Sequence, residues 1–553
     1  MITLGLNVWT VRQTARAVSN VPWRDQWWFI GELAAYLAGG SWWPTLWNVY
    51  WGHRCVLTRL IFLADAKLFA LANSPLVALI FALQALEAGL FIFVARLLGT
   101  GRSVKMILVA AVTMHLMFSS LQMENFVWGF QVHCSMVHLF AALAFLSLVQ
   151  CRRVVATKAS GWGLAAVGSA LLSSYSMVNG LITWPLLVLQ AFVLRLPKKL
   201  ILVLGLIGTG VVGTYLITYK RPPQFGMGFA GFLTRPHLGI ALTGMVLGGP
   251  WSVVSLRWGT VAGLVGIAVA LHLLLRVFRA NSPGQPAAGF FAMVMLFHLL
   301  TAVSVVIGRI SPEWLASLHG TDPLPSRYYT SSFLFWVALF VLALGSLPSC
   351  RWGWIPVAAV SPVILALTFG TVRWQVREAQ NWVQYYHEMD AAASAFLVGV
   401  SDQLLLERVY PAENQRTHLV EVLKRYRLSV FAEPRAEWLG RTLAEAFGSR
   451  PLSTCAGAVD NIETLPDIRY TRLSGWIDWR RRSVPHDIVL TDARERIVGV
   501  GRSGLKRPDL ASQLAPDAAS NAGWLGYGES TPASELRIYG VDARQNLCQV
   551  PVP

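Results

Sequence analysis

The chain contains a series of long apolar stretches, each of about 20 residues, the length that an α-helix needs to cross a bilayer. These stretches lie near 75–98, 104–121, 132–150, 161–177, 180–195, 200–219, 256–279, 288–308, 328–347 and 354–372. A shorter apolar run at 2–11 opens the chain. It predicts either a first helix that continues past Arg12 or a protein whose true start lies upstream of this sequence. We therefore expect a multi-pass α-helical membrane protein with about eleven spans.

The composition agrees with this expectation and excludes other classes. Hydrophobic residues make up 54% of the 553 residues and charged residues only 14%, whereas soluble proteins carry about 25% charged residues. A soluble enzyme, a disordered protein and a fibre are all excluded on this basis. The net charge of +17 falls largely in short loops, where it orients helices and meets anionic lipid. Nucleic acid is therefore not an expected partner, and membrane lipids are.

The basic loops predict the orientation of the chain. Lys and Arg gather in alternate short loops, near residues 96–105, 152–158, 195–199, 276–279 and 351. Such loops stay in the cytoplasm. The outer side then receives residues 12–74, 122–131, 220–255, 309–327 and everything after 373. We expect a membrane protein whose C-terminal region is extracytoplasmic.

The composition changes after Arg373, which indicates three regions. Residues 1–373 form the transmembrane domain with its outer loops, and 374–450 read as a polar helical linker region. Residues 451–553 contain short strand-like runs such as RLSGWIDW, DIVLTD and ELRIYGVD between turn residues, and these predict a small periplasmic β-sandwich. Four aromatic residues in it are open to two interpretations, sugar stacking or the sandwich core: Trp476, Trp479, Trp524 and Tyr527.

Two cysteines bracket this predicted β-domain. Cys455 and Cys548 are the only cysteines after Cys350, and both fall on the oxidising side of the membrane. We therefore expect a disulfide between them. The spacing of the cysteines does not suggest a zinc site.

The outer segment from Val21 to Leu68 is rich in tryptophan, as in an interfacial belt. Among these tryptophans is one acid, Asp25, ahead of the polar pair His53 and Arg54 and of Arg59. We expect Asp25 to line a cavity open to the outer side, within reach of His53 or Arg54. The alternative for Asp25 is a solvated loop acid or a partner of Arg24. The alternative for His53 and Arg54 is a pair facing lipid headgroups.

Further polar residues fall on the same predicted side. They are Glu124, Asn125 and Gln131 in QMENFVWGFQ, Lys220 and Arg221, and Arg327 and Tyr328 at a helix start. An ionisable residue at membrane depth suggests function, so the first group is open to sugar binding or to packing as a loop plug. Lys220 and Arg221 lie on the outer side against the charge bias, which suggests either an anionic partner or a wrongly drawn span near 238–255. Arg327 and Tyr328 are open to phosphate binding or to anchoring at the interface.

Several motifs carry a resemblance when they are taken in order. WRDQW, GHRCVLTRLIFLAD, QMENFVWGFQ, SYSMVNGLITWP and SRYYTSSFLFW resemble a bacterial family of polytopic membrane proteins similar to the GT-C glycosyltransferases. The resemblance runs over roughly residues 20–372 and more loosely to the C-terminus. It implies a location in the bacterial inner membrane and transfer of a sugar from a polyprenyl-phosphate donor to an outer glycan or lipid acceptor. The catalytic role that it implies maps onto Asp25 alone.

The chemistry of such a transfer fits these residue types. A base must take the proton of the acceptor hydroxyl, and a positioned carboxylate is suited to this. The leaving phosphate needs cationic donors, and the candidates on the predicted outer side are Arg54, Arg59, Lys220, Arg221 and Arg327. The first outer loop has no DxD or similar acidic cluster, so we expect neither a required metal nor another cofactor.

Two other functions remain open. A transporter or flippase of a lipid-linked glycan would use the same basic groups without a reaction, but it typically shows paired inverted halves, which this sequence does not display. A non-catalytic cell-envelope assembly protein would bind glycan through its outer β-domain and would not need the loop acid.

Overall fold

The computed structural model describes residues 2–98, 103–154, 156–217, 219, 226–279, 286–311, 324–346, 355–448, 452–478, 487–514, 519, 521–532, 534–542 and 544–552. The chain divides into two compact units. The membrane unit consists of Met1–Arg12, Trp42–Leu60 and Val77–Ala379. The C-terminal unit consists of Gln13–Ser41, Ile61–Leu76 and Gln380–Pro553. The N-terminal 373 residues, treated above as one region, thus contribute two segments to the C-terminal unit.

The membrane unit is built from apolar helices. Among the described residues, seven helical segments are long and apolar enough to cross a membrane: Ser74–Arg96, Lys105–Val127, Gly129–Arg153, Lys198–Leu216, Leu256–Arg279, Pro286–Arg309 and Ser326–Gly345. The chain is therefore a multi-pass membrane protein. The described spans are fewer than the eleven predicted, partly because some apolar runs are broken. The run at 180–195, for example, divides into a 3₁₀ turn at Val178–Ile182 and the short helix α10 (Thr183–Val193).

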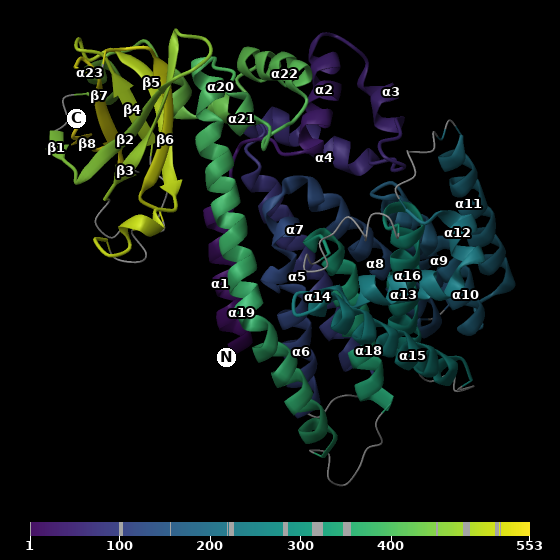
Figure 1. Ribbon diagram of the computed structural model, residues 1–553. Coiled ribbons are helices and arrows are strands. Elements are labelled where there is room, and N and C mark those ends of the chain that lie inside the picture. Colours follow the sequence, from purple (N-terminus) through teal and green to yellow (C-terminus); the bar gives the residue numbers. More distant parts are fainter. Residues whose placement is uncertain are drawn as a thin grey trace. The chain divides into compact units, whose positions relative to one another are not determined.

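The described α-helices that lie wholly or partly in the membrane unit are labelled in Figure 1. They are α1 (Ile2–Ala17), α3 (Trp42–Trp47), α4 (Val56–Phe69), α5 (Ser74–Arg96), α6 (Ser103–Met117), α7 (Met123–Val127), α8 (Val132–Arg153), α9 (Ala156–Ser174), α10, α11 (Lys198–Leu216), α12 (Gly228–Thr234), α13 (Pro236–Leu247), α14 (Gly249–Ser252), α15 (Leu256–Arg279), α16 (Pro286–Arg309), α18 (Tyr329–Ser346) and the start of α19 (Ile355–Ala392). The first helix continues past Arg12 to Ala17, which is one of the two alternatives for this segment.

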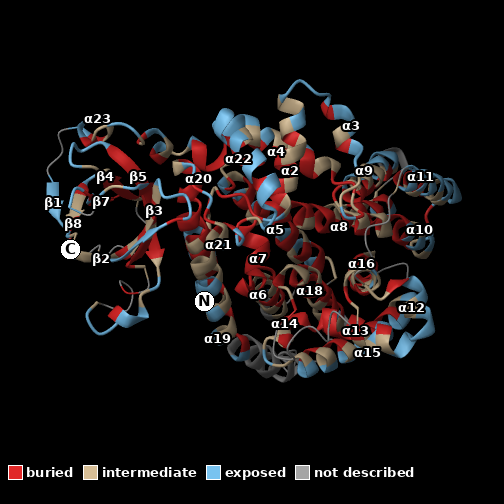
Figure 2. Ribbon diagram, turned by 45° about the horizontal axis from the view of Figure 1, so that its top comes forward, coloured by how far each residue is buried: buried red, intermediate tan, exposed pale blue. Residues whose placement is uncertain are grey.

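Helices α8 and α16 form the centre of the membrane unit. Both are buried along most of their length, and α8 packs against α9, α10 and α16. Helix α11 buries only four side chains, and Figure 2 shows α11 and α12 as largely exposed ribbons. In a membrane protein an exposed apolar helix faces lipid, so α11 has the pattern of a peripheral span.

The helical part of the C-terminal unit contains several short helices. They are α2 (Asp25–Leu37), the end of α19, α20 (Ser394–Val398), α21 (Gln403–Leu406), α22 (Glu413–Arg425) and α23 (Leu443–Phe447). Trp23 and Trp27 are 2% and 0% exposed within this unit, so the prediction that they join an interfacial belt is wrong. They pack in a protein core instead. Trp43, Trp47 and Trp51 of the membrane unit are exposed, as a belt requires.

The last hundred residues form a single eight-stranded sheet. The strands are β1 (Leu452–Thr454), β2 (Gly457–Thr464), β3 (Tyr470–Ile477), β4 (Asp487–Thr491), β5 (Ile497–Leu505), β6 (Gly523–Glu529), β7 (Arg537–Val541) and β8 (Leu547–Val550). Their order is β1-β8-β7-β4-β5-β6-β3-β2, with β1 parallel to β8 and the other neighbours antiparallel. Alternate residues of β3 point inward, and Trp524 and Tyr527 are 1% and 0% exposed. These two aromatics therefore belong to the core, whereas Trp476 is half-buried and Trp479 lies outside the described residues.

This sheet is curled into a half-barrel. A flat sheet of eight strands would separate its two edges by roughly 34 Å, because neighbouring strands lie about 4.8 Å apart. The two edge strands are β1 and β2, and only Cys455 and Ala456 connect them. The sheet must bend to bring its edges within reach of this link. The predicted two-sheet sandwich is therefore corrected to one curled sheet, since strand order depends on long-range pairing that a single sequence does not display.

The predicted disulfide is present at the same place. Cys455 lies in the link between the two edge strands, Cys548 lies in β8, and their Cα atoms are 5.4 Å apart. The bridge therefore ties the link between the two edges to the strand next to β1. A disulfide forms and persists in oxidising compartments, which agrees with an extracytoplasmic position for the sheet.

We predict that loss of this bridge destabilises the sheet. The bridge closes a loop of 93 residues, for which the chain-entropy argument gives a stabilisation of up to about 4–5 kcal/mol. The variant C455S/C548S should therefore unfold at a lower temperature than the wild type in detergent. The control is Cys134→Ser, which removes an unbridged thiol and should leave the sheet intact. Maleimide labelling of Cys455 and Cys548 in the folded, non-reduced protein would show that no bridge exists.

Candidate functional site

Asp25 is the first residue of α2, and the residue before it has an unusual backbone conformation. Arg24 has φ 47° and ψ −114°, outside the regions that non-glycine residues normally adopt. Such a conformation costs on the order of 1–3 kcal/mol and occurs most often at active sites and ligand clamps. The N-terminal end of a helix favours negative charge. The half-buried Asp25 carboxylate thus lies where an anion is stabilised, next to a strained residue.

Aromatic rings gather around this end of α2. The Trp23 indole N–H donates to the Tyr385 hydroxyl at 3.0 Å, and its ring lies 5.4 Å from that of Trp382 in an edge-on contact. Trp27 stacks on Tyr410 with 5.6 Å between ring centroids. Trp23 and Trp27 are buried, whereas Trp382, Tyr385 and Tyr410 are half-buried. The half-buried rings are of the kind that stacks on the apolar face of a sugar.

The same unit also carries charged groups close to these aromatic rings. Burial, and after it the Asp25 carboxylate, raises the pKa of Tyr410, which places these two groups within electrostatic reach. The Arg24 guanidinium lies over the Trp23 ring at 4.4 Å, and Arg408 forms a 2.6 Å ion pair with Glu388. The neighbourhood therefore combines a carboxylate, cations and aromatic faces.

Sequence reasoning missed Trp382, Tyr385 and Tyr410. They lie far from Asp25 in the chain, in a segment whose pattern indicates only polar helices. The signal was the aromatic density of NWVQYYHEM, which is unusual for a solvated helix. Without the fold, nothing in the sequence connects this segment to α2.

In the membrane unit, the predicted phosphate-binding arginines bind the backbone. Arg54 donates to the backbone carbonyls of Trp47 and Ile217 and through Nε to that of Tyr215 at 3.1 Å. Arg59 donates to the carbonyl of Asn48 at 2.9 Å. Both guanidinium groups thus hold the 46–48 segment through carbonyl oxygens, and their side chains are 4% and 1% exposed.

His53 lies in the same outer segment and contacts Arg309. Its Nε2 lies 3.4 Å from the Arg309 guanidinium, which also donates to the carbonyl of Trp51 at 2.9 Å. The backbone N–H of Val178 donates to its Nδ1 at 3.4 Å. Burial, followed by the Arg309 charge, lowers the pKa of His53 to about 3. The ring is therefore neutral over the physiological pH range.

A second polar group in the membrane unit joins α7 to the start of α18. Glu124 and Arg327 form a 2.9 Å ion pair, and Glu124 also accepts from the Arg327 backbone N–H at 3.1 Å. Asn125 donates to the Arg327 carbonyl at 3.1 Å and to Thr330 at 2.7 Å. Three of the predicted binding residues are thus partners of one another, as a loop plug would be.

The remaining predicted residues are placed as follows. Gln131 accepts a hydrogen bond from the Cys134 thiol at 3.0 Å, and the Tyr328 ring lies 5.2 Å from the Arg327 guanidinium. Lys220 and Arg221 lie outside the described residues. Asp25 belongs to the C-terminal unit, whereas His53 and Arg54 belong to the membrane unit. Their proximity to Asp25 therefore stays a prediction.

Comparisons with protein-family models, with curated proteins and with solved structures find no match for this chain. The resemblance to GT-C enzymes therefore depends on the sequence motifs alone.

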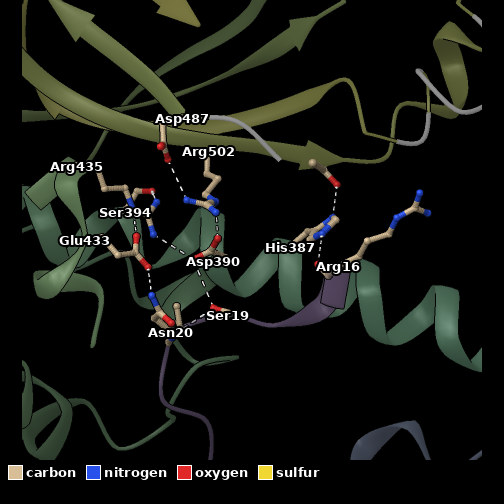
Figure 3. Close-up of polar contacts among 12 residues, drawn as sticks. Arg16, Ser19, Asn20, His387, Asp390, Ser394, Glu433, Arg435, Asp487 and Arg502 are labelled. Carbon is tan, nitrogen blue, oxygen red and sulfur yellow. Dashed lines mark hydrogen bonds and ion pairs between the residues drawn. The ribbon is translucent and has the colours of Figure 1, made fainter. Parts of the chain in front are cut away.

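A buried network of charges in the C-terminal unit connects its helical part to the sheet (Figure 3). Asp390 of α19 forms ion pairs with Arg435 at 3.0 Å and with Arg502 of β5 at 2.6 Å. Arg435 also pairs with Glu433 at 2.6 Å, and Arg502 with Asp487 of β4 at 3.0 Å. Burial opposes the charge on Asp390, but Arg502 and Arg435 outweigh it and hold the pKa of Asp390 below its ordinary value.

The N-terminal segment of the C-terminal unit joins the same network. The Ser19 hydroxyl donates to Asp390 at 3.4 Å, and the Asn20 amide donates to Glu433 at 2.8 Å. The imidazole of His387, one turn before Asp390 on α19, lies between the carbonyls of Gly504 and Arg16 at 3.1 and 2.9 Å. The charged groups point at one another in Figure 3, so we interpret the network as structural. It fixes the part of α19 that carries the aromatic rings near Asp25.

We predict that Arg435→Ala severely destabilises the C-terminal unit. The substitution leaves Asp390 and Glu433 without a principal buried cation, and breaking a buried pair in this way typically costs about 3–5 kcal/mol. Arg427→Ala is the matched control, because it removes a surface ion pair: the side chain of Arg427 is 68% exposed and that of its partner Glu437 is 46% exposed. Such surface pairs contribute about 0–1 kcal/mol. Thermal unfolding of the two full-length variants in detergent compares them, and equal unfolding temperatures would contradict the prediction.

Proposed function

We propose that this protein is a bacterial inner-membrane glycosyltransferase that moves a sugar from a polyprenyl-phosphate donor to an outer glycan or lipid acceptor. The observation that supports this proposal most directly is the environment of Asp25. A half-buried carboxylate at a helix N-terminus lies beside a strained arginine and among half-buried aromatic rings. A placed carboxylate can act as the base in glycosyl transfer, and exposed aromatic faces can stack on the sugar.

The proposed reaction balances with one base. The acceptor hydroxyl oxygen attacks the anomeric carbon of the donor sugar, and its proton passes to the Asp25 carboxylate. The bond between the anomeric carbon and the phosphate oxygen breaks, and the prenyl phosphate leaves with the bonding electrons. Proton transfer to a positioned carboxylate contributes about 10²–10⁴-fold to such a step.

The leaving phosphate requires cations, and the contacts favour a different set from the one first predicted. Arg54 and Arg59 donate to backbone carbonyls, and Arg327 pairs with Glu124. Arg24, next to the base, is an exposed cation of the unit that carries Asp25. Arg408 of the same unit is also exposed, but it pairs with Glu388. We propose that Arg24 attracts the donor phosphate.

We predict that Asp25→Asn reduces sugar transfer by at least about 100-fold while donor binding persists. The amide keeps the size of the side chain but does not accept a proton, so the loss falls on the chemical step. The measurement is transfer from a radiolabelled polyprenyl-phosphate sugar in reconstituted vesicles, with donor retention measured in parallel. Glu421→Gln changes an exposed acid of α22 and controls for charge.

The outcomes of this experiment separate the proposed functions. Full turnover by Asp25→Asn removes Asp25 from the mechanism. Movement of an intact lipid-linked glycan across the vesicle membrane, with no new glycosidic bond, identifies the flippase alternative.

We predict that the C-terminal sheet is periplasmic. A reporter enzyme that is active only in the periplasm, fused after Pro553, should be active, because the sheet contains a disulfide that the cytoplasm would reduce. The same reporter inserted after Arg153, in a predicted cytoplasmic loop, should be inactive. The opposite pattern would place Asp25 away from a polyprenyl donor at the outer surface.

A further inference from the structure

A small cavity lies in the C-terminal unit, among α2, the neighbouring part of α4 and the segment before α2. Its volume is about 10 Å³, which is room for about one water molecule or one bare ion. Asp65, Asn20 and Gln26 supply its polar lining, and apolar side chains such as Phe29, Ile30 and Phe62 supply most of the rest. An acid in such a place calls for a physical explanation.

Asp65 is buried without a hydrogen-bond donor. Its side chain is 3% exposed, and within the described part of the chain neither carboxylate oxygen has a hydrogen-bond partner. The residues that line the cavity include no other charged group. An ionised carboxylate in apolar surroundings is costly unless it is paired with a cation. In its ionised form the carboxylate therefore needs a cation that the residues lining the cavity do not supply; the alternative is that it binds a proton.

The polar neighbours of Asp65 are held in place by hydrogen bonds. Gln26 accepts from the Trp23 backbone N–H at 3.0 Å and donates to Asn73 at 3.4 Å. Asn20 donates through its side-chain N–H to Glu433 at 2.8 Å, and its side-chain amide oxygen is of the kind that can serve as a cation ligand. The cavity thus offers oxygen ligands on a fixed frame, and oxygen is the ligand that hard cations prefer.

We propose that this cavity is a binding site for one dehydrated monovalent cation, Na⁺ in size and charge, held by the Asp65 carboxylate with the Asn20 and Gln26 side-chain oxygens. One carboxylate balances one positive charge. A Ca²⁺ ion takes six to eight oxygen ligands and Mg²⁺ keeps several waters, and the cavity has space for neither arrangement. The site goes beyond the proposed glycosyl transfer and does not depend on it.

The cation competes with a proton for the same carboxylate. Burial raises the pKa of Asp65 to about 7, so without a cation the acid takes up a proton as the pH falls below neutrality. The folded form then binds a proton that the unfolded chain, with its ordinary aspartate pKa, releases. Without Na⁺, the stabilisation from this proton is full below about pH 4 and is lost as the pH rises through 7. With Na⁺, the cation replaces the proton above pH 7 and restores the stability.

The test is the unfolding temperature of the full-length protein in detergent. At pH 8 we expect it to rise with NaCl concentration and to saturate, as ligand linkage requires, while choline chloride at equal ionic strength has no such effect. At pH 5.5 the apparent Na⁺ affinity should fall by more than tenfold, because the protonated acid no longer binds the ion. Asp65→Asn should abolish the Na⁺-dependent shift, whereas Glu421→Gln should retain it.

Direct binding keeps the proposal testable if the variant fails to fold. Equilibrium binding of ²²Na⁺ to the wild type at pH 8 should saturate near one ion per chain and be displaced by protons. Three results would each overturn the proposal: no saturable ²²Na⁺ binding, a shift that choline reproduces, or an unchanged shift in Asp65→Asn. A pH-dependent stability without any Na⁺ dependence would instead show that Asp65 is a protonated acid beside a water molecule.

Discussion

The C-terminal unit depends on the pairing of one buried acid with two arginines. Asp390 lies between Arg435 and Arg502, and these arginines belong to a 3₁₀ turn before α23 (Pro434–Glu437) and to β5. Asp390 and Arg435 are buried and Arg502 is half-buried, and each of the three has more than one partner, which offsets the cost of removing their charges from water. If one of these charged side chains is removed, the remaining charges stay in the protein interior, where an unpaired ion is strongly unfavourable. The network therefore imposes a specific arrangement of helix and sheet, which nonspecific apolar packing alone does not.

The same network explains how residues late in the chain help to position the site near α2. The end of α19 carries both Asp390 and the rings of Trp382 and Tyr385 that contact Trp23. The ion pairs of Asp390 thus hold one turn of α19 in position, and the preceding turns of the same helix carry the aromatic rings. The aromatic rings near Asp25 are therefore carried by a rigid helix, and a functional site built on a rigid element holds its geometry more precisely than one on a loop.

Much of the fold could be predicted from local patterns, whereas the partners of individual charges could not. Apolar run length predicts the membrane helices, short alternating runs predict the strands, and two isolated cysteines on one side predict their bridge. Arg54 and Arg59 show the limit. Their position suggested anion binding, but they bind carbonyls of Trp47 and Asn48, and no sequence pattern marks which carbonyls lack a helical partner. Strand order in the sheet and the aromatic partners of Asp25 also depend on contacts between distant residues.

The interleaving of the two units has a consequence for the synthesis of the protein. Trp23 and its partner Tyr385 are separated by 362 residues, and a ribosome that adds roughly 5–20 residues per second needs about 20–70 s to cover that distance. During this interval the α2 segment, with its buried tryptophans and the acid at its start, has left the ribosome without the surface that covers it. The exposed aromatic side chains of this segment can form wrong contacts while most of the membrane helices are being inserted. Slow codons would lengthen this interval, and a chaperone that binds the segment would protect it until the C-terminal strands have been synthesised.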